Sequence, residues 1–271
     1  MALVLPKGAW DSQVHVFGAP YPLSPERAYD APPNSDVDAM LQMHRQFGFE
    51  FGVIVQASAQ GFDTRHVTHA LSLVPHYTGV VLMNGRISDE QFAELHSAGV
   101  RGGRFVFLPG LGVRPDYASL ERVLPKLREL GWFVKVFATA GDWVELKPYL
   151  ERADLPIMID HLGYVDPAAG ADQPAMEVIL DLLKRKNFWM MLSCGDRISK
   201  APDRSDVIPY AKAFIEAAPD RVVWGSDWPH IAYKQSPPSN EETLGLLLRY
   251  AQDDHQLERI VSLNPSRFFN L

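Results

Sequence analysis

Eight short apolar segments alternate with stretches of helical periodicity along most of the chain. The segments are rich in β-branched and aromatic residues, which suit strands that are packed on both faces. In chain order they cover residues 9–17, 51–56, 77–83, 100–107, 132–138, 156–160, 188–193 and 222–224. Helical patterns cover 36–47, 63–74, 88–98, 117–130, 141–151, 174–185 and 207–218, and two closing helices cover 241–251 and 255–262. This alternation predicts a parallel sheet covered by helices.

Eight strand–helix units fit a (β/α)8 barrel better than an open doubly wound sheet. Such barrels commonly occupy a chain of this length, 271 residues, as one unit. The sequence has no linker-like stretch and no internal repeat, so we expect a single domain over residues 1–271. The stretch 18–33 is rich in Pro and Gly without any period, which predicts a long loop.

The charge balance limits the classes of partner. The formal net charge of -7 argues against nucleic acid and against an anionic membrane surface. No apolar run approaches the length that spans a bilayer, and the first four residues are too few for a signal-peptide core, so we expect a cytoplasmic protein. Cys194 is the single cysteine, which excludes an internal disulfide, and we expect it to be a small buried residue.

Polar and ionisable side chains follow most of the predicted strands, where the active sites of (β/α)8 barrels lie. They are Asp11, Gln13, His15, Gln56, Ser58, Asn84, Arg86, Arg101, Arg104, Asp160, His161, Ser193, Cys194, Arg197, Asp227 and His230. A histidine at a strand end is by itself more often a satisfied polar residue than a catalyst. The convergence of histidines, a carboxylate and several arginines on one mouth is more informative.

Other residues have ordinary structural interpretations. Asp160 is expected to orient His161 or to cap a turn. The side chain of Lys135, within the fifth strand, points either into the barrel or at the helices. The bulk of four aromatic residues, Tyr21, Phe107, Phe137 and Trp228, predicts a ring-sized pocket. The histidines on predicted helices or helix ends, which are His44, His66, His69, His76, His96 and His255, are expected to be solvated.

Three motifs together resemble the amidohydrolase superfamily: DSQVH at 11–15, DHLG at 160–163 and WGSDWPH at 224–230. The branch most similar to this chain contains 2-pyrone-4,6-dicarboxylate lactonase and sugar-lactone enzymes. The resemblance covers nearly the whole chain, including the segments 93–105, 207–230 and 264–269. It implies a distorted (β/α)8 barrel that hydrolyses a lactone.

The resemblance also implies roles for individual residues. The residue matching Asp227 is the general base for water, and those matching His161 and His15 polarise the lactone carbonyl. The arginines matching Arg104 and Arg197 hold a substrate carboxylate. Substrate contacts are further expected from Gln13, Ser58, Asn84, Phe137, Trp228 and His230.

This sequence departs from the family pattern at several positions. Gln13 replaces the first histidine of the usual His-x-His motif, glutamine is a poor zinc ligand, and strand five ends without a histidine. We therefore expect no required cofactor, with a single divalent ion such as zinc on His15, His161 and Asp227 as the alternative. Gly110 lies about where the pyrone enzyme has a second carboxylate-binding arginine, and Phe137 stands for its active-site tyrosine. Both changes count against the pyrone dicarboxylate itself.

Two other functions stay open. The Gln-x-His form resembles a galactarolactone isomerase of the same branch, but that enzyme has Asn at the position of Asp227, and Asn cannot act as a general base. A non-catalytic protein that binds sugar acids is the other alternative, whereas the missing histidine disfavours a decarboxylase. We expect a hydrolase that opens a small anionic lactone, and a homodimer is compatible with the sequence.

Overall fold

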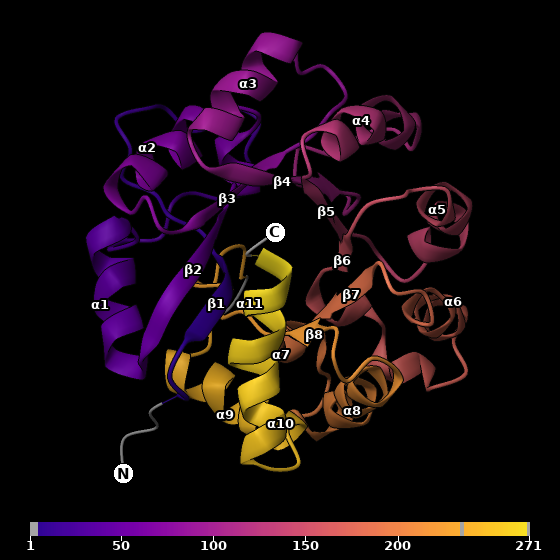
Figure 1. The fold of residues 1–271 in the computed structure, drawn as a ribbon. Coiled ribbons are helices and arrows are strands. Elements are labelled where there is room, and N and C mark those ends of the chain that lie inside the picture. The colour runs from indigo at the N-terminus through magenta and orange to yellow at the C-terminus, as the bar shows by residue number, and fades with distance from the viewer. Residues whose placement is uncertain (1–4, 234–235, 270–271) are drawn as a thin grey trace.

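The chain forms a parallel barrel surrounded by helices (Figure 1), in a computed structural model that describes residues 5–233 and 236–269. Each of the eight strands pairs in parallel with the next one along the chain, from β1 to β8. The strands are β1 (Ala9–Val14), β2 (Phe49–Val55), β3 (Thr78–Leu82), β4 (Val100–Val106), β5 (Phe133–Phe137), β6 (Ile157–Ile159), β7 (Phe188–Met191) and β8 (Val222–Val223). The predicted (β/α)8 fold is confirmed.

The helices follow the strands as the periodicity predicts. They are α1 (Val37–Phe47), α2 (Arg65–Leu73), α3 (Asp89–Ser97), α4 (Ala118–Glu129), α5 (Asp142–Glu151), α6 (Pro174–Leu183), α7 (Gly195–Ile198), α8 (Ile208–Ala217), α9 (Asn240–Tyr250), α10 (Asp254–Glu258) and α11 (Asn264–Phe269). Sequence signals account for several ends. Ser88 and Gln91 form a capping box at the start of α3, and Gly48 ends α1 in the left-handed conformation.

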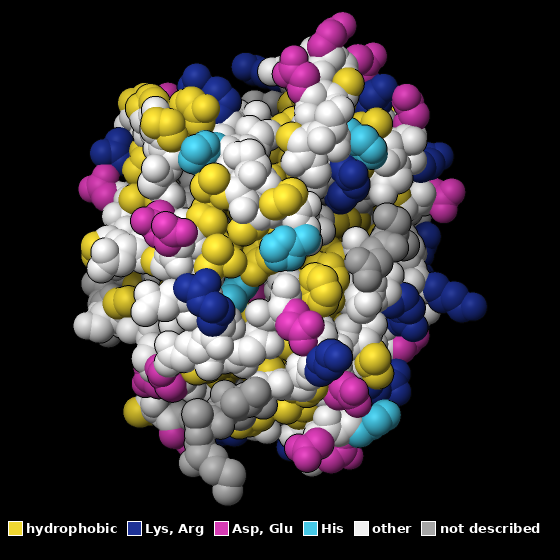
Figure 2. Space-filling view, turned by 60° about the vertical axis from the view of Figure 1, so that its left-hand side comes forward, with side chains coloured by type: hydrophobic (Ala, Val, Ile, Leu, Met, Phe, Trp, Pro, Cys, Tyr) yellow, Lys and Arg dark blue, Asp and Glu magenta, His cyan; other side chains and the backbone are white. Residues whose placement is uncertain are grey.

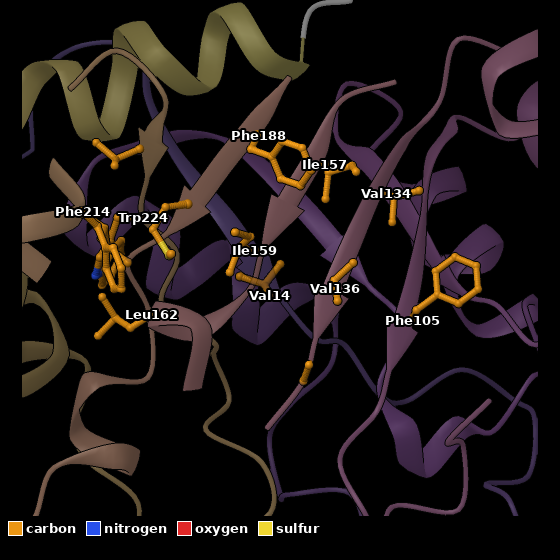
Figure 3. Close-up of a cluster of buried hydrophobic side chains, with 14 of the residues drawn as sticks. Val14, Phe105, Val134, Val136, Ile157, Ile159, Leu162, Phe188, Phe214 and Trp224 are labelled. Atoms are coloured by element: carbon orange, nitrogen blue, oxygen red, sulfur yellow. The ribbon is translucent and has the colours of Figure 1, made fainter. Parts of the chain in front are cut away.

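The two faces of the strands serve different layers. Outward-facing residues such as Val14, Phe105 and Val136 belong to the main hydrophobic core between the strands and the helices (Figure 3). Inside the barrel, aromatic residues including Trp10, Phe133 and Trp189 form a second cluster together with Phe268 and Phe269 of α11. Figure 1 shows α11 lying across this end of the barrel. The end of the barrel interior next to α11 is therefore filled with apolar side chains. Polar groups can gather at the other end, where the strands have their carboxyl ends.

The barrel closes between β1 and the residues that follow β8. The backbone N–H of Ser12 donates to the carbonyl of Trp224 at 3.1 Å, and that of His15 donates to the carbonyl of Trp228 at 2.8 Å. Gly225 is required at this seam, because a Cβ there would lie 2.6 Å from the backbone nitrogen of Gln13. The predicted first strand, 9–17, is shortened to Ala9–Val14. The N–H of His15 donates to Trp228 and that of Phe17 to Ser35, and neither acceptor lies in a strand.

An irregularity in β1 sets the direction of its polar side chains. The pairing register with β2 shifts between Asp11 and Val14, as at a β-bulge. Asp11 therefore faces α1, where its carboxylate lies 3.4 Å from Nε2 of His44. Gln13 and His15 instead face the interior, where both contact Asp227.

Two of the histidines expected to be solvated are buried, so that expectation was wrong for them. His44 lies on the inner face of α1 and contacts the Tyr77 hydroxyl at 2.8 Å, and His66 contacts the carbonyl of Pro22 at 3.2 Å. The helical period places both on the apolar face, where each ring contacts a neighbouring polar group through one nitrogen. On the molecular surface, Figure 2 shows acidic and basic side chains interspersed around a central group of hydrophobic ones. Among the residues described, no helix is long and apolar enough to cross a bilayer.

Candidate active site

A partly open cavity lies at the carboxyl ends of the strands. Strand ends and the loops after them supply its lining, which is His15, Tyr29, Ser58, Arg104, Val106, Leu111, Phe137, His161, Arg197, Asp227, Ile231 and Ala232. Val106, Leu111 and Phe137, from β4, the loop after it and β5, form an apolar wall, whereas the ionisable side chains of the lining are His15, Arg104, His161, Arg197 and Asp227, besides Tyr29. A ring-sized molecule therefore meets charge on one side and hydrocarbon on the other.

Asp227 is surrounded by hydrogen-bond donors. Its Oδ1 lies 3.2 Å from Nε2 of His15 and accepts from the Gln13 amide at 3.2 Å. Its Oδ2 accepts from the thiol of Cys194 and from Nη2 of Arg197, each at 3.2 Å. Burial by itself would raise the pKa of Asp227, but the hydrogen bond to His15 and the charge of Arg197 oppose burial, and that pKa lies well below its usual range. Asp227 is therefore an ionised carboxylate facing the cavity.

His161 is held as a neutral imidazole. Its Nδ1 lies 2.7 Å from Oγ of Ser193, and its Nε2 lies 2.9 Å from Nη2 of Arg104. A guanidinium can only donate, so Nε2 carries the lone pair and the proton lies on Nδ1. Burial lowers the pKa of His161 to about 3, against the opposing effect of the nearby carboxylates. The Phe137 ring packs edge-on against this imidazole at 4.5 Å.

His15 bridges the cavity and the barrel wall. Its Nδ1 lies 2.7 Å from the carbonyl oxygen of Val55, so this nitrogen must carry a proton. Its Nε2 faces the Asp227 carboxylate, with 3.2 Å between Nε2 and Oδ1. Gln13 lies between the two histidines and the carboxylate, because its amide nitrogen is 3.3 Å from Nε2 of His161.

Three fully or nearly buried ionisable groups, Arg104 of the cavity lining and Asp160 and Lys135 behind it, contact one another. Asp160 accepts from Nε of Arg104 at 2.9 Å through Oδ2, and Nζ of Lys135 lies 3.1 Å from Oδ1. The Lys135 and Asp160 side chains have no exposed surface, so Lys135 points into the barrel. Burial lowers the pKa of Lys135, whereas Lys135 and Arg104 overcome burial to lower the pKa of Asp160. Asp160, expected to orient His161 or to cap a turn, instead binds these two cations.

Arg197 and Cys194 come from the turn after β7 and the short helix α7, which the sequence did not predict. Arg197 donates to the carbonyl of Ile231 at 2.8 Å in addition to Asp227, and its guanidinium stacks on Tyr233 at 4.5 Å. Its Nε is buried without a hydrogen-bond partner among the residues described. Cys194 is buried as expected, and burial is the main reason that the pKa of its thiol is raised well above the usual range.

The residues that follow three strands adopt a backbone conformation that side chains rarely take. The φ angle is +55° at His161, +56° at Cys194 and +57° at Asp227. Such left-handed non-glycine residues cost about 1–3 kcal/mol each and persist only where the surroundings hold them. Their clustering at one cavity is typical of a functional site.

The structure brings together most of the residues that the sequence singled out. His15, Ser58, Arg104, Phe137, His161, Arg197 and Asp227 line the cavity, and Gln13 contacts two of them. Asn84 lies instead beside Phe62 and Arg86 in a separate depression, and its Oδ1 accepts from the backbone of Arg86 at 3.0 Å.

Two other expected contacts also lie outside the lining. Trp228 is part of the main hydrophobic core, and His230 contacts Oδ1 of Asn240 at 2.9 Å. Tyr29 is a lining residue that the sequence reasoning missed, because it lies in the aperiodic loop 18–33. Its hydroxyl lies 3.0 Å from Oγ of Ser58. An aromatic residue inside a Pro-rich loop was the one available signal.

The arrangement of the possible ligand atoms is unfavourable for a divalent metal ion. Of the three ligands considered, His161 directs its free Nε2 at the Arg104 guanidinium, and a cation would compete with that positive charge. The ligand atoms that converge within 4.8 Å in the described part of the chain belong to His161, Cys194 and Asp227, without His15. A thiol whose pKa is raised is a reluctant ligand, since metals bind the thiolate. The residues therefore do not fit a zinc site.

Comparison with known proteins gives consistent matches. A sequence model of the amidohydrolase family matches residues 5–271. The 4-sulfomuconolactone hydrolase of Hydrogenophaga intermedia is 34% identical over 276 residues, which cover 99% of this chain and 91% of that protein. The 2-pyrone-4,6-dicarboxylate hydrolase of Comamonas testosteroni is 31% identical, with coverage of 98% and 91%.

More distant comparisons agree. The solved structure of a probable 2-pyrone-4,6-dicarboxylic acid hydrolase from Acinetobacter baumannii, with citric acid bound, has a TM-score of 0.88 at 25% identity and covers 97% of this chain and 100% of its own. The D-galactarolactone isomerase of Agrobacterium fabrum is 24% identical, covering 98% of this chain and 92% of the isomerase.

Proposed function

Because the chain belongs to the amidohydrolase family, we propose that it hydrolyses the lactone ring of a small anionic substrate with water activated by Asp227. The family resemblance of the three motifs is thereby confirmed. The observation that carries the proposal is the ionised Asp227 carboxylate, which faces the cavity beside two imidazoles and two guanidinium groups. Relatives that are 34% and 31% identical are named as lactone hydrolases, which supports the same reaction.

The reaction needs a base, a site for the oxyanion and a proton for the leaving oxygen. Asp227 takes a proton as water attacks the lactone carbonyl, and the new C–O bond places negative charge on the carbonyl oxygen. The Arg104 guanidinium and the His15 ring both line the cavity and stabilise this charge. The protonated Asp227 then gives its proton to the ring oxygen as the ring C–O bond breaks, which leaves an open hydroxy acid.

His161 has a different role from the one that the resemblance implies. Since its Nε2 accepts from Arg104, a neutral His161 does not donate to the carbonyl in this arrangement. We assign to it the task of aiming the Arg104 guanidinium at the oxyanion. Arg104, expected to hold a substrate carboxylate, is already committed to Asp160 and His161 through Nε and Nη2.

Arg197 is then the cation that binds the anionic group of the substrate. Its buried Nε lacks a partner among the described residues, and it lies next to the base, so a carboxylate bound there places the lactone ring over Asp227. The apolar wall formed by Val106, Leu111 and Phe137 offers no polar side chain to a second anionic group. Burying an unpaired carboxylate against this wall is costly. The preferred substrate therefore carries one anionic group and an apolar edge.

We further propose that the reaction requires no metal. The Arg104 guanidinium contacts the free Nε2 of His161. It supplies there the positive charge that a metal ion supplies in other active sites. The base likewise needs no metal to be ionised, because its neighbours already hold its pKa low.

A panel of lactones tests the function. Purified protein is mixed with a carboxymethyl butenolide, 2-pyrone-4,6-dicarboxylate and a galactaric acid lactone, with and without chelator, and acid release and NMR spectra of the products are recorded. We expect open acid to be released fastest from the singly charged butenolide, with unchanged rates in chelator. A ring-shifted lactone without acid supports an isomerase, and binding without turnover supports a binding protein. Stoichiometric zinc with chelator-sensitive turnover contradicts the metal-independent route.

A further inference from the structure

We infer that Asp11, which lies on the outer side of β1 and outside the cavity lining, is a positioning residue that holds the turn carrying Asp227. The inference rests on the proposed role of Asp227 as the base. Asp11 contacts neither the cavity nor Asp227 itself, so its effect on the reaction is transmitted through Ser226.

The Asp11 carboxylate is completely buried and is surrounded by donors. Oδ1 accepts from the backbone N–H of Ser226 at 2.8 Å and from that of Gln13 at 3.3 Å. Oδ2 accepts from the Ser226 hydroxyl at 2.5 Å and lies 3.4 Å from Nε2 of His44. A single side chain thus joins β1, the turn after β8 and helix α1.

Ser226 passes this restraint along the turn. Its Oγ accepts from the backbone N–H of Trp228 at 3.0 Å, so Asp11 and Ser226 together fix both neighbours of Asp227. The N–H of Asp227 itself donates to the carbonyl of Gln13 at 3.0 Å. This frame holds Asp227 at its positive φ of +57° and directs its carboxylate to His15 and the cavity.

The side chains around Asp11 are closely packed and hold it in place. Its second neighbour, His44, contacts the Tyr77 hydroxyl at 2.8 Å through the other ring nitrogen. Gly52 leaves room for both rings, because a Cβ there would lie 2.4 Å from the Tyr77 ring and 3.0 Å from that of His44. The three hydrogen bonds that Asp11 accepts come from N–H and O–H donors of Ser226 and Gln13, so an amide of the same shape would turn an N–H toward one of them.

Asp11→Asn tests the inference on the intact enzyme with the carboxymethyl butenolide as substrate. Since misplacement of a catalytic group by about 1 Å costs up to about 100-fold in rate, we expect kcat to fall by about 10- to 100-fold. KM should stay within about twofold, because Arg197 and the apolar wall are untouched. Ser226→Ala should lower kcat in the same way, and the double variant should be no worse than the more impaired single variant, since both act on one restraint.

Asp142→Asn is the matched control. Asp142 is also a buried carboxylate that organises a turn, accepting from the backbone N–H and hydroxyl of Thr139, but it contacts no part of the Asp227 turn. It should lower the melting temperature with little change in kcat. If Asp11→Asn behaves like this control, with full kcat in the folded fraction, Asp11 is merely structural and the inference is wrong.

Failure of the proposed function is distinguished by crystallography. If the wild-type protein opens no lactone, the lactonase proposal fails, and the structure of Asp11→Asn still decides the positioning role. The inference predicts that the distance from His15 Nε2 to Asp227 Oδ1 grows beyond hydrogen-bond range or that φ of Asp227 leaves the left-handed region. An unchanged turn contradicts it.

Discussion

Replacing Asp160 should destabilise the barrel far more than replacing the lysine that pairs with it. Arg104 and Lys135 share this one carboxylate, at 2.9 and 3.1 Å, and all three groups are buried. Asp160→Asn leaves two cations uncompensated, and breaking a buried ion pair in this way costs about 3–5 kcal/mol. Lys135→Met instead leaves a one-to-one pair and removes a buried ammonium, so we expect a loss of only about 1–2 kcal/mol from the unpaired Oδ1.

Urea unfolding at neutral pH measures both changes as free energies of unfolding. The double variant Lys135→Met with Asp160→Asn tests the direction of the effect of Lys135→Met on stability. It leaves one buried cation instead of two, so it should be more stable than Asp160→Asn alone. If Lys135→Met costs as much as Asp160→Asn, or if the two losses simply add, then Arg104, Lys135 and Asp160 do not balance one another as their contacts indicate.

Two further predictions concern acid stability and substrate choice. Burial lowers the pKa of His161 from an ordinary 6.5 to about 3. Between these two pH values His161 is protonated in the unfolded chain but not in the folded one. The free energy of unfolding should therefore fall with pH from 6.5 toward 3, by at most about 1.4 kcal/mol per unit from this group, and His161→Gln should flatten that part of a urea-unfolding series. Leu111→Arg places a cation on the apolar wall and should raise kcat/KM for 2-pyrone-4,6-dicarboxylate relative to the carboxymethyl butenolide by about 10-fold or more, whereas Leu111→Met should leave the ratio unchanged. Equal ratios in both variants contradict the assignment of that wall.

The fold could be predicted from the sequence because strand and helix periods are local properties. Each apolar run is long enough to identify a strand, and eight such runs separated by helical patterns leave few architectures. The closure of the barrel could not be predicted in detail. It depends on the register shift within β1 and on the close approach of Gly225 to Gln13, and neither has a periodic signature.

Site residues could be predicted from the sequence where their position directly after a strand brings them to the cavity. His15, His161 and Asp227 meet because each follows a strand of the same barrel. The depth of each side chain in the barrel and the direction in which it points could not be predicted. Asp160 lies deep enough to pair with two cations, whereas Asn84 turns back to the backbone of its own loop.

The direct test of the proposed mechanism is the rate of lactone hydrolysis by Asp227→Asn. The amide keeps the shape of the side chain but cannot accept the proton of water, so kcat should fall by about 10²–10⁴. Binding of the lactone, measured by calorimetry, should persist because Arg197 and the apolar wall remain. A variant that hydrolyses the lactone at the wild-type rate would show that Asp227 is not the base.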